Sequence, residues 1–364
     1  MIETLREIIT ESPSFYVGWG GLLIGLVFGF VVFRTNFCTM GSISDMLSFG
    51  DFRRFRSWLF AIAIAILGVG LMQNLGIVET ANSIYLMPML GWGGAIVGGL
   101  MFGVGMVYAG GCLSKNLVRA GSGDLRSLMV LIVTGLFGFM TISGLLALAR
   151  LSIFMPLSVD LGEKGLETQS IAELLASITG GSQATLNLVV ILVFSLGLLT
   201  FCLKDKSFRS SPIHLIAGIG IGACVIAGWA LTGLAYDDFA DVPIAPISLS
   251  FVRPTGETLE YMMRSTALGA PGFGIVTLLG TLLGSFLGSI TSKKFHLATF
   301  ANVPDTLSNM GGAALMGIGG VLALGCTVGQ GLSGISTLAI GSVIAFIAIV
   351  IGGIIGIKLM EHFA

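Results

Sequence analysis

Long apolar runs and short glycine-rich or polar stretches alternate along the whole chain. The runs approach or reach the ~20 apolar residues that a helix needs to cross a bilayer. They lack the alternation of polar and apolar residues that is typical of a β-barrel strand, so we predict transmembrane helices. The nine predicted crossings lie near residues 15–33, 57–75, 93–110, 125–149, 185–203, 212–232, 267–290, 310–325 and 338–358.

Four of the intervening stretches are rich in glycine or polar residues and too short to cross a bilayer. They cover 36–47, 112–121, 236–262 and 327–336. Irregular backbone at membrane depth is tolerated only where it is buried in protein or lines a cavity. We therefore predict four short re-entrant helix-loops. The longest polar insert, 151–184, is expected to be an external loop with a short amphipathic helix.

Composition indicates an all-α polytopic membrane protein and excludes a soluble one. Of the 364 residues, 54% are apolar and 10% are charged, against ~25% charged residues in an average soluble domain. No charged residue occurs from Thr306 to Ile357. With a net charge of −1 the chain is not expected to bind nucleic acid. We treat residues 1–364 as a single transmembrane domain in a lipid bilayer.

Basic residues gather on alternate connections between the crossings. They are Arg53, Arg54, Arg56, Arg119, Arg126, Lys204, Lys206, Arg209, Lys293 and Lys294. The other connections, 76–92, 151–184 and 233–250, contain one basic residue among them, Lys164. Because basic residues are retained on the cytoplasmic side of a membrane, this pattern predicts an N-terminus outside and a C-terminus in the cytoplasm. We expect a multi-pass protein of a bacterial inner membrane.

An internal repeat predicts two halves of opposite orientation. Residues 98–112 read GGLMFGVGMVYAGGC and residues 312–326 read GAALMGIGGVLALGC. Both end in Gly-Cys, and many positions between are identical. We predict a first repeat at 15–150, an external loop and connecting helix at 151–211, and a second repeat at 212–364. Because a single connecting helix lies between the two repeats, the second repeat enters the membrane in the opposite orientation. Inverted repeats of this kind place transport sites between the halves.

Three of the five cysteines stand in the polar or glycine-rich breaks: Cys38, Cys112 and Cys326. A helix that restarts after such a break points free N–H groups at whatever fills the cavity, and its positive end favours an anion. A thiol in apolar surroundings stays protonated and adds a soft hydrogen-bond donor. No cysteine or histidine spacing fits a metal site or a disulfide framework, and we expect no cofactor, no metal and no enzymatic activity.

At these segments the sequence resembles the YeeE/YedE family of membrane proteins, whose characterised type takes up thiosulfate. The resemblance rests on Arg34–Met46, Gly98–Arg119 and Gly317–Gly334. It implies nine crossings with four re-entrant helix-loops and a central path. The resemblance further implies that Cys38, Cys112 and Cys326 relay thiosulfate along this path by S–H hydrogen bonds. It also implies a possible separate cytoplasmic sulfur carrier that resembles TusA.

A second group of residues is predicted to line the path or its mouths. Its members are Arg34, Asn36, Ser114, Lys115, Gln330 and Ser333. Glu257 falls roughly where Cys38 falls in the first half, and we expect it to point away from an anion path. Cys202 and Cys224 lie inside plain apolar runs, and we expect them to pack as small hydrophobic residues.

Three other functions stay open at this point. The first is transport of a selenium oxyanion or another sulfur-containing anion. The second is a membrane thiol oxidoreductase, which the absence of a CxxC pair disfavours. The third is a scaffold protein, which leaves three cysteines at membrane breaks unexplained.

Overall fold

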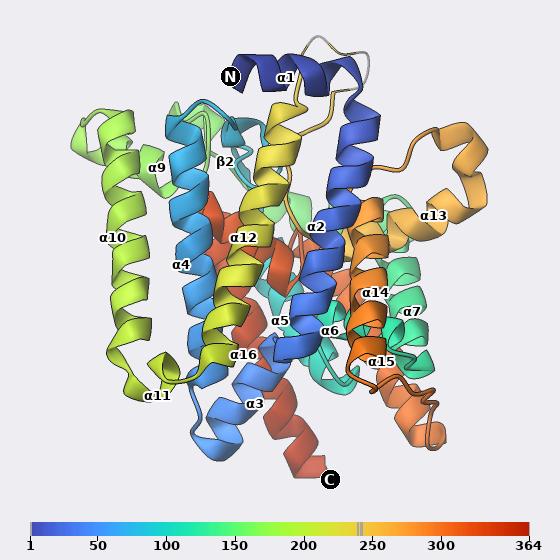
Figure 1. Ribbon diagram of the computed structural model, residues 1–364. Helices are drawn as coiled ribbons and strands as arrows, with labels where there is room; N and C mark the ends of the chain where they lie inside the picture. The colour runs from blue at the N-terminus through green and yellow to red at the C-terminus, as the bar shows by residue number, and fades with distance from the viewer. Residues whose placement is uncertain (1, 239, 241–242, 364) are drawn as a thin grey trace.

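The computed structural model describes residues 2–238, 240 and 243–363. Its long helices lie roughly side by side (Figure 1). They are α2 (Pro13–Thr35), α4 (Arg53–Asn74), α5 (Trp92–Tyr108), α7 (Leu125–Ile142), α10 (Gln183–Lys204), α12 (Pro212–Leu234), α14 (Phe273–Thr291), α15 (Val303–Leu322) and α16 (Ile340–Phe363). Each occupies one of the crossings that the sequence predicts.

In the described part of the chain, eight helical segments are long and apolar enough to cross a membrane. The prediction of an all-α polytopic membrane protein is therefore confirmed. α15 is 20 residues long but is not one of the eight, because its first turns carry polar residues such as Asp305 and Asn309. α7 ends at Ile142 rather than near residue 149, and a turn leads from there into α8 (Ala147–Phe154).

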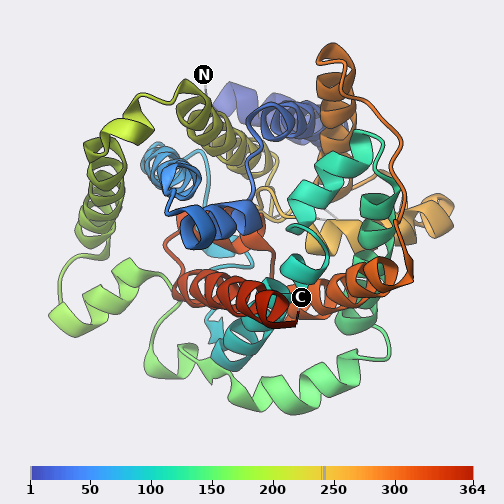
Figure 2. The same ribbon diagram turned by 90° about the horizontal axis from the view of Figure 1, so that it is seen from below.

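Short helices occupy the four predicted re-entrant stretches. They are α3 (Thr39–Phe49), α6 (Leu113–Gly121), α13 (Val252–Leu268) and η4 (Gly329–Gly334), a π-helical segment. The third predicted stretch, 236–262, includes residues 239, 241 and 242, which lie outside the described residues. Its helix begins late and extends beyond residue 262. Figure 2 looks along the long helices and shows α3 beside α16, with which it is in contact, and Figure 1 shows α3 at the end of the molecule that carries the C-terminus.

The remaining elements are short and lie mainly at the ends of the long helices. They are α1 (Ile2–Glu11), η1 (Thr80–Asn82), β1 (Met89–Leu90), η2 (Met155–Leu157), β2 (Val159–Asp160), η3 (Gly162–Lys164), α9 (Ile171–Thr179) and α11 (Lys206–Arg209). β1 and β2 pair antiparallel, with Met89 opposite Asp160. The predicted polar insert 151–184 therefore contains α9. Its strand β2 pairs with β1, which lies in the connection between α4 and α5.

The long helices of the first half pack on long helices of the second half. α2 packs on α14, and α12 packs on α4. In the same way α5 packs on α16, and α15 packs on α7. α2 runs away from the end that carries α1, whereas α12 follows α11 at the opposite end (Figure 1). These paired contacts are the pattern expected if the two halves are related by a two-fold axis in the membrane plane.

Glycines bring α2 and α14 into close contact. A Cβ atom at Gly25 would meet the Thr277 carbonyl oxygen at 2.2 Å, and one at Gly284 would meet the Leu26 oxygen at 1.9 Å. Small residues let helix backbones approach closely in membranes, where packing drives association. This approach leaves the interior to the re-entrant segments and to large buried side chains such as Trp58 and Phe28.

Candidate functional site

Each of the three predicted cysteines stands directly before a short helix. Cys38 is the N-cap of α3 and Cys112 is the N-cap of α6. Cys326 precedes the helical turn that begins at Thr327 and leads into η4. The first N–H groups of a helix have no partner within the helix. Two of the thiols accept such a group: Gly41 N donates to Cys38 Sγ at 3.5 Å, and Gly329 N to Cys326 Sγ at 3.4 Å.

The structure brings two of these thiols together. Cys38 Sγ lies 3.9 Å from Cys112 Sγ, and Ser114 Oγ lies 3.3 Å from Cys112 Sγ. Cys38 is 5% exposed, and Cys112 is fully buried. The backbone N–H groups of Thr39 and Lys115 also interact with the Cys112 sulfur. The starts of α3 and α6 thus converge on one pair of thiols, although the two cysteines are far apart in the sequence.

A cleft of about 610 Å³ adjoins the thiol pair and carries four basic side chains. It is lined by Phe33, Arg34, Asn36, Lys115, Val118, Arg119, Ser122, Ser292 and Lys294. Arg34 Nη1 donates to Ser292 Oγ at 2.6 Å, and Arg119 Nη1 donates to Gly110 O at 2.6 Å. Lys115 Nζ donates to Asn36 Oδ1.

The charged lining of this cleft is entirely basic. Among the described residues, none of its four basic side chains forms an ion pair with a carboxylate. Asn36 precedes Cys38 by two residues, and Lys115 follows Cys112 by three, so two residues of the cleft wall are neighbours in sequence of the thiol pair, which does not itself line the cleft. Because opposite charge attracts an anion into a cleft lined by one sign of charge, this surface is suited to a small anion.

The predicted residues around Cys326 form a separate group. Gln330 Nε2 donates to Ala323 O at 2.6 Å, and Ser333 Oγ donates to Leu249 O at 2.6 Å. Ser333 thereby ties the Cys326 segment to the loop before α13. Ala323, Gln330 and Tyr85 line a cavity of about 20 Å³, which has room for about one water molecule. It lies beside Leu90 of β1, away from the basic cleft.

Sequence reasoning missed several residues of these two groups. The sequence favoured a topology role for Arg119, with attraction of anions to the inner mouth as its alternative, and gave Lys294 a topology role alone, yet both share the cleft with Arg34 and Lys115. Asn116, four residues after Cys112, donates to Gly111 O at 2.8 Å. Gln330 stands four residues after Cys326, so an amide at the same offset in both repeats was a signal available in the sequence. No sequence pattern indicated that Lys294 would lie opposite Lys115.

Among the described residues, no hydrogen bond joins Glu257, Cys202 or Cys224 to the three thiols. Glu257 Oε1 accepts from Arg253 Nε at 2.6 Å on the partly exposed face of α13. Cys202 Sγ contacts Arg56 O at 3.4 Å and packs with Phe60 and Phe208. Cys224 is 4% exposed. Cys202 and Cys224 are buried among apolar residues, as expected for packing positions.

A family model described as Sulphur transport matches residues 34–355. The chain belongs to the sulphur transport family. The match includes all three thiol segments and every residue of the basic cleft except Phe33. The chain is thus a multi-pass membrane protein of a transport family, and its resemblance to YeeE/YedE proteins is confirmed.

Two curated relatives are similar to most of the chain, and a third is similar to part of it. The thiosulfate transporter TsuA of Escherichia coli (strain K12) is 27% identical over 329 residues, or 86% of each chain. The thiosulfate transporter TsuA of Spirochaeta thermophila is 28% identical over 344 residues, covering 92% of this chain and 96% of that protein. The probable transporter YedE of Salmonella typhimurium is 29% identical over 107 residues, or 29% of this chain and 24% of that protein.

Proposed function

We propose that this member of the sulphur transport family takes up thiosulfate across a bacterial inner membrane. Two relatives of nearly the same length carry the name of thiosulfate transporter. The thiol pair beside a basic cleft is the observation that carries the proposal. Four basic side chains supply positive charge, and neutral thiols donate to an anion without repelling it. These two features together suit an anion that ends in a polarizable sulfur atom.

The path that we propose begins near Cys326 and ends in the basic cleft. The anion passes from Cys326 to the pair Cys112 and Cys38, and from there past Lys115 to the cytoplasm. At each station the S–H group donates to the terminal sulfur, and helix N–H groups face the anion. No covalent bond forms. Binding at each station has to be weak enough for release to the next, which favours single thiol hydrogen bonds over an ion pair.

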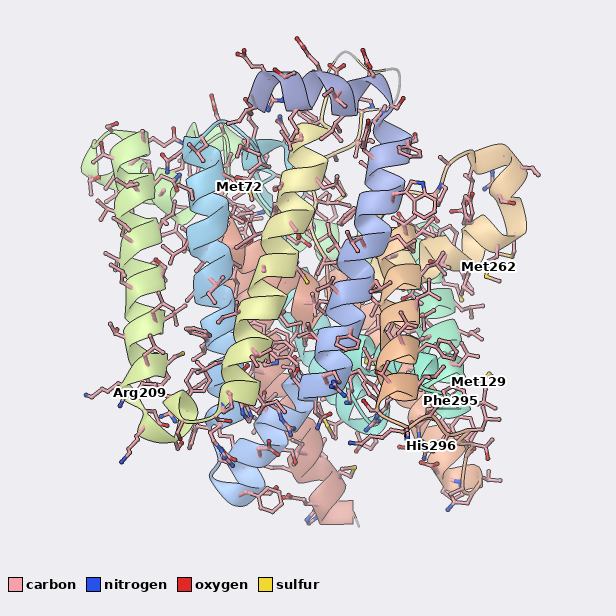
Figure 3. All side chains as sticks on the ribbon, in the orientation of Figure 1. Met72, Met129, Arg209, Met262, Phe295 and His296 are labelled. Carbon is pink, nitrogen blue, oxygen red and sulfur yellow. The ribbon has the colours of Figure 1, made fainter. Side chains whose placement is uncertain are left out.

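The direction of this path follows from the distribution of basic residues. Figure 3 places Arg209 and His296 near the end of the molecule that carries the C-terminus, and the start of α4 with its arginines lies at that end too. The basic cleft lies at the same end, because Arg34, which lines it, stands in the last turn of α2. By the positive-inside rule we assign this end to the cytoplasm and the end with α1 to the outside. The two halves act as inverted repeats around the path.

The proposed activity is transport and not catalysis. Consumption of thiosulfate in the cytoplasm, or a coupled ion, provides the driving force. A separate TusA-like sulfur carrier on the cytoplasmic side would receive the sulfur. Such a carrier would meet the end of the molecule that carries α11 and the C-terminus of α16.

The test is uptake of ³⁵S-labelled thiosulfate by cells that lack their own importers. We expect the intact chain to transport, and Cys38→Ala, Cys112→Ala and Cys326→Ala to lose most of the flux. Cys202→Ala is the matched control, because its thiol is also buried but packs between α10 and α4. All variants are compared at equal amounts in the membrane. Normal flux in all of the cysteine variants would refute the thiol path.

Two alternatives have their own outcomes in this experiment. If selenite, selenate or sulfite competes better than unlabelled thiosulfate, the substrate is another anion of the same class. The 3.9 Å separation of Cys38 and Cys112 favours a thiol oxidoreductase as the second candidate function. A disulfide or mixed disulfide that forms during turnover, measured by mass spectrometry of the intact protein, would support it and contradict the non-covalent relay.

A further inference from the structure

Three buried hydrogen-bond donors near the thiols have no partner in the described part of the chain. They are the hydroxyls of Thr39 and Thr327 and the indole N–H of Trp58. Thr39 is 2% exposed, Trp58 is 1% exposed and Thr327 is fully buried. Buried polar groups in proteins are nearly always hydrogen-bonded, and an indole N–H can only donate. Such donors therefore call for an acceptor that occupies the interior at some stage.

The two threonines share a local position, directly after a cysteine, although the internal repeat pairs Cys326 with Cys112 and therefore Thr327 with Leu113. Thr39 directly follows Cys38 as the first residue of α3, and Thr327 directly follows Cys326 as the first helical residue after that break. A threonine hydroxyl on a helix usually bonds a carbonyl of the preceding turn, but no helical turn precedes these positions. The hydroxyls are therefore left beside the thiols.

Trp58 connects the two threonine positions. Its ring stacks on Phe37, the residue before Cys38, with centroids 4.5 Å apart, and on Phe346 with centroids 6.1 Å apart. The Phe346 ring in turn packs against Gly331 of η4, where a Cβ atom would meet it at 2.5 Å. A continuous stack thus runs from the Cys38 segment to the Cys326 segment, and the free indole N–H lies along it.

The chemistry of these donors complements that of the thiols. Hydroxyl and indole groups are hard donors that suit sulfonate-like oxygens, whereas thiols suit a terminal sulfur atom. Hydrogen bonds to a charged acceptor are stronger than those between neutral groups. We propose that Thr39, Trp58 and Thr327 bind the oxygen atoms of the transported anion while the cysteines bind its sulfur atom. This inference rests on the proposed function and adds three substrate-contacting residues to it.

The experiment uses variants that remove a donor and keep the shape of the side chain. Thr39→Val and Thr327→Val are made in the full chain and reconstituted into liposomes. KM and maximal rate are measured with labelled thiosulfate, and thermal unfolding is measured in detergent. The matched control is Thr281→Val, because the Thr281 hydroxyl is also fully buried but donates to Thr277 O at 2.7 Å.

The expected result separates transport from stability. Each of the two test variants raises the KM for thiosulfate about tenfold, the effect of one lost hydrogen bond to a charged group. Their unfolding midpoints stay unchanged or rise, because the deleted hydroxyl had no partner. Thr281→Val keeps the wild-type KM and unfolds at a lower temperature. Two tryptophan variants extend the test. Trp58→Phe is expected to raise the KM. The control Trp229→Phe, which loses a hydrogen bond to Ser336 Oγ at 3.0 Å, is expected to leave the KM unchanged.

Other outcomes decide against the inference in distinct ways. Wild-type KM values in both valine variants, alongside inactive cysteine variants, would overturn the inference and leave the proposed function standing. Valine variants that lose stability and flux in parallel would assign the hydroxyls to structure and also overturn it. An intact chain that moves no thiosulfate would refute the proposed function, and the inference would fall with it.

Discussion

Gly110 and Leu324 adopt the same left-handed backbone conformation, with φ angles of +69° and +58°. Each stands two residues before a cysteine of the proposed path, Cys112 in one case and Cys326 in the other. The alignment of residues 98–112 with 312–326 pairs the two positions. Glycine adopts this conformation freely, whereas a leucine pays ~1–2 kcal/mol for it. The second half therefore keeps the turn of the first half without the residue best suited to it.

Leu324→Gly is expected to stabilise the protein by about 1 kcal/mol. The Leu324 side chain is 52% exposed, so little packing is lost when it is removed. Unfolding in detergent, followed by denaturant or heat, measures the change. Leu307→Gly is the control, since this exposed leucine lies within α15, where glycine costs about 1 kcal/mol. Equal losses of stability in the two variants would show that Leu324 is not strained.

Asn116 and Gln330 stabilise the two cysteine turns in the same way. Asn116 Nδ2 donates to Gly111 O at 2.8 Å and also reaches Ala109 O at 3.4 Å. Gln330 Nε2 donates to Ala323 O at 2.6 Å, and Ala323 aligns with Ala109. The side-chain N–H group of Gln330, which the sequence assigned to the path, is thus engaged with its own turn, whereas Gln330 Oε1 has no hydrogen-bond partner in the described part of the chain.

Asn116→Leu and Gln330→Leu are each expected to destabilise the protein by about 1–3 kcal/mol, because buried carbonyls lose their donor. Thermal unfolding in detergent measures the effect. Asn74→Leu serves as the control: Asn74 bonds Gly70 O near the exposed end of α4, and its loss should stay within ~0.5 kcal/mol. Gln330→Leu with unchanged stability and strongly reduced uptake would instead return Gln330 to the path.

The long helices could be predicted from sequence because lipid requires apolar runs of nearly fixed length. The thiol segments could be predicted because glycine and polar residues interrupt those runs. The meeting of Arg34, Lys115 and Lys294 in one cleft could not be predicted, because it depends on how α14 packs against α2. The end of α7 near Ile142 was also missed: the apolar run continues through Leu145 and Leu148, but the chain turns there and enters α8.

Gly25→Ala is expected to disrupt the contact between α2 and α14. Its new Cβ atom would lie 2.2 Å from Thr277 O, a backbone atom that moves only with the helix. Overpacking of this kind costs about 1–3 kcal/mol. Gly18→Ala on the same helix is the control, because no atom lies within 4 Å of its added Cβ. Unfolding midpoints in detergent compare the two, and equal midpoints would contradict the close approach.

The basic cleft yields a prediction that also tests the orientation of the chain. Lys294→Gln removes a charge that lines the cleft, whereas Lys293→Gln removes its exposed neighbour outside it. If the cleft faces the cytoplasm, Lys294→Gln raises the KM for thiosulfate entry into inside-out vesicles several-fold and leaves right-side-out vesicles unchanged. The effect should shrink towards 1 M salt, where the screening length falls to about 3 Å. A KM change confined to right-side-out vesicles would place the cleft outside and reverse the proposed path, and equal effects of the two lysines would remove the cleft from it.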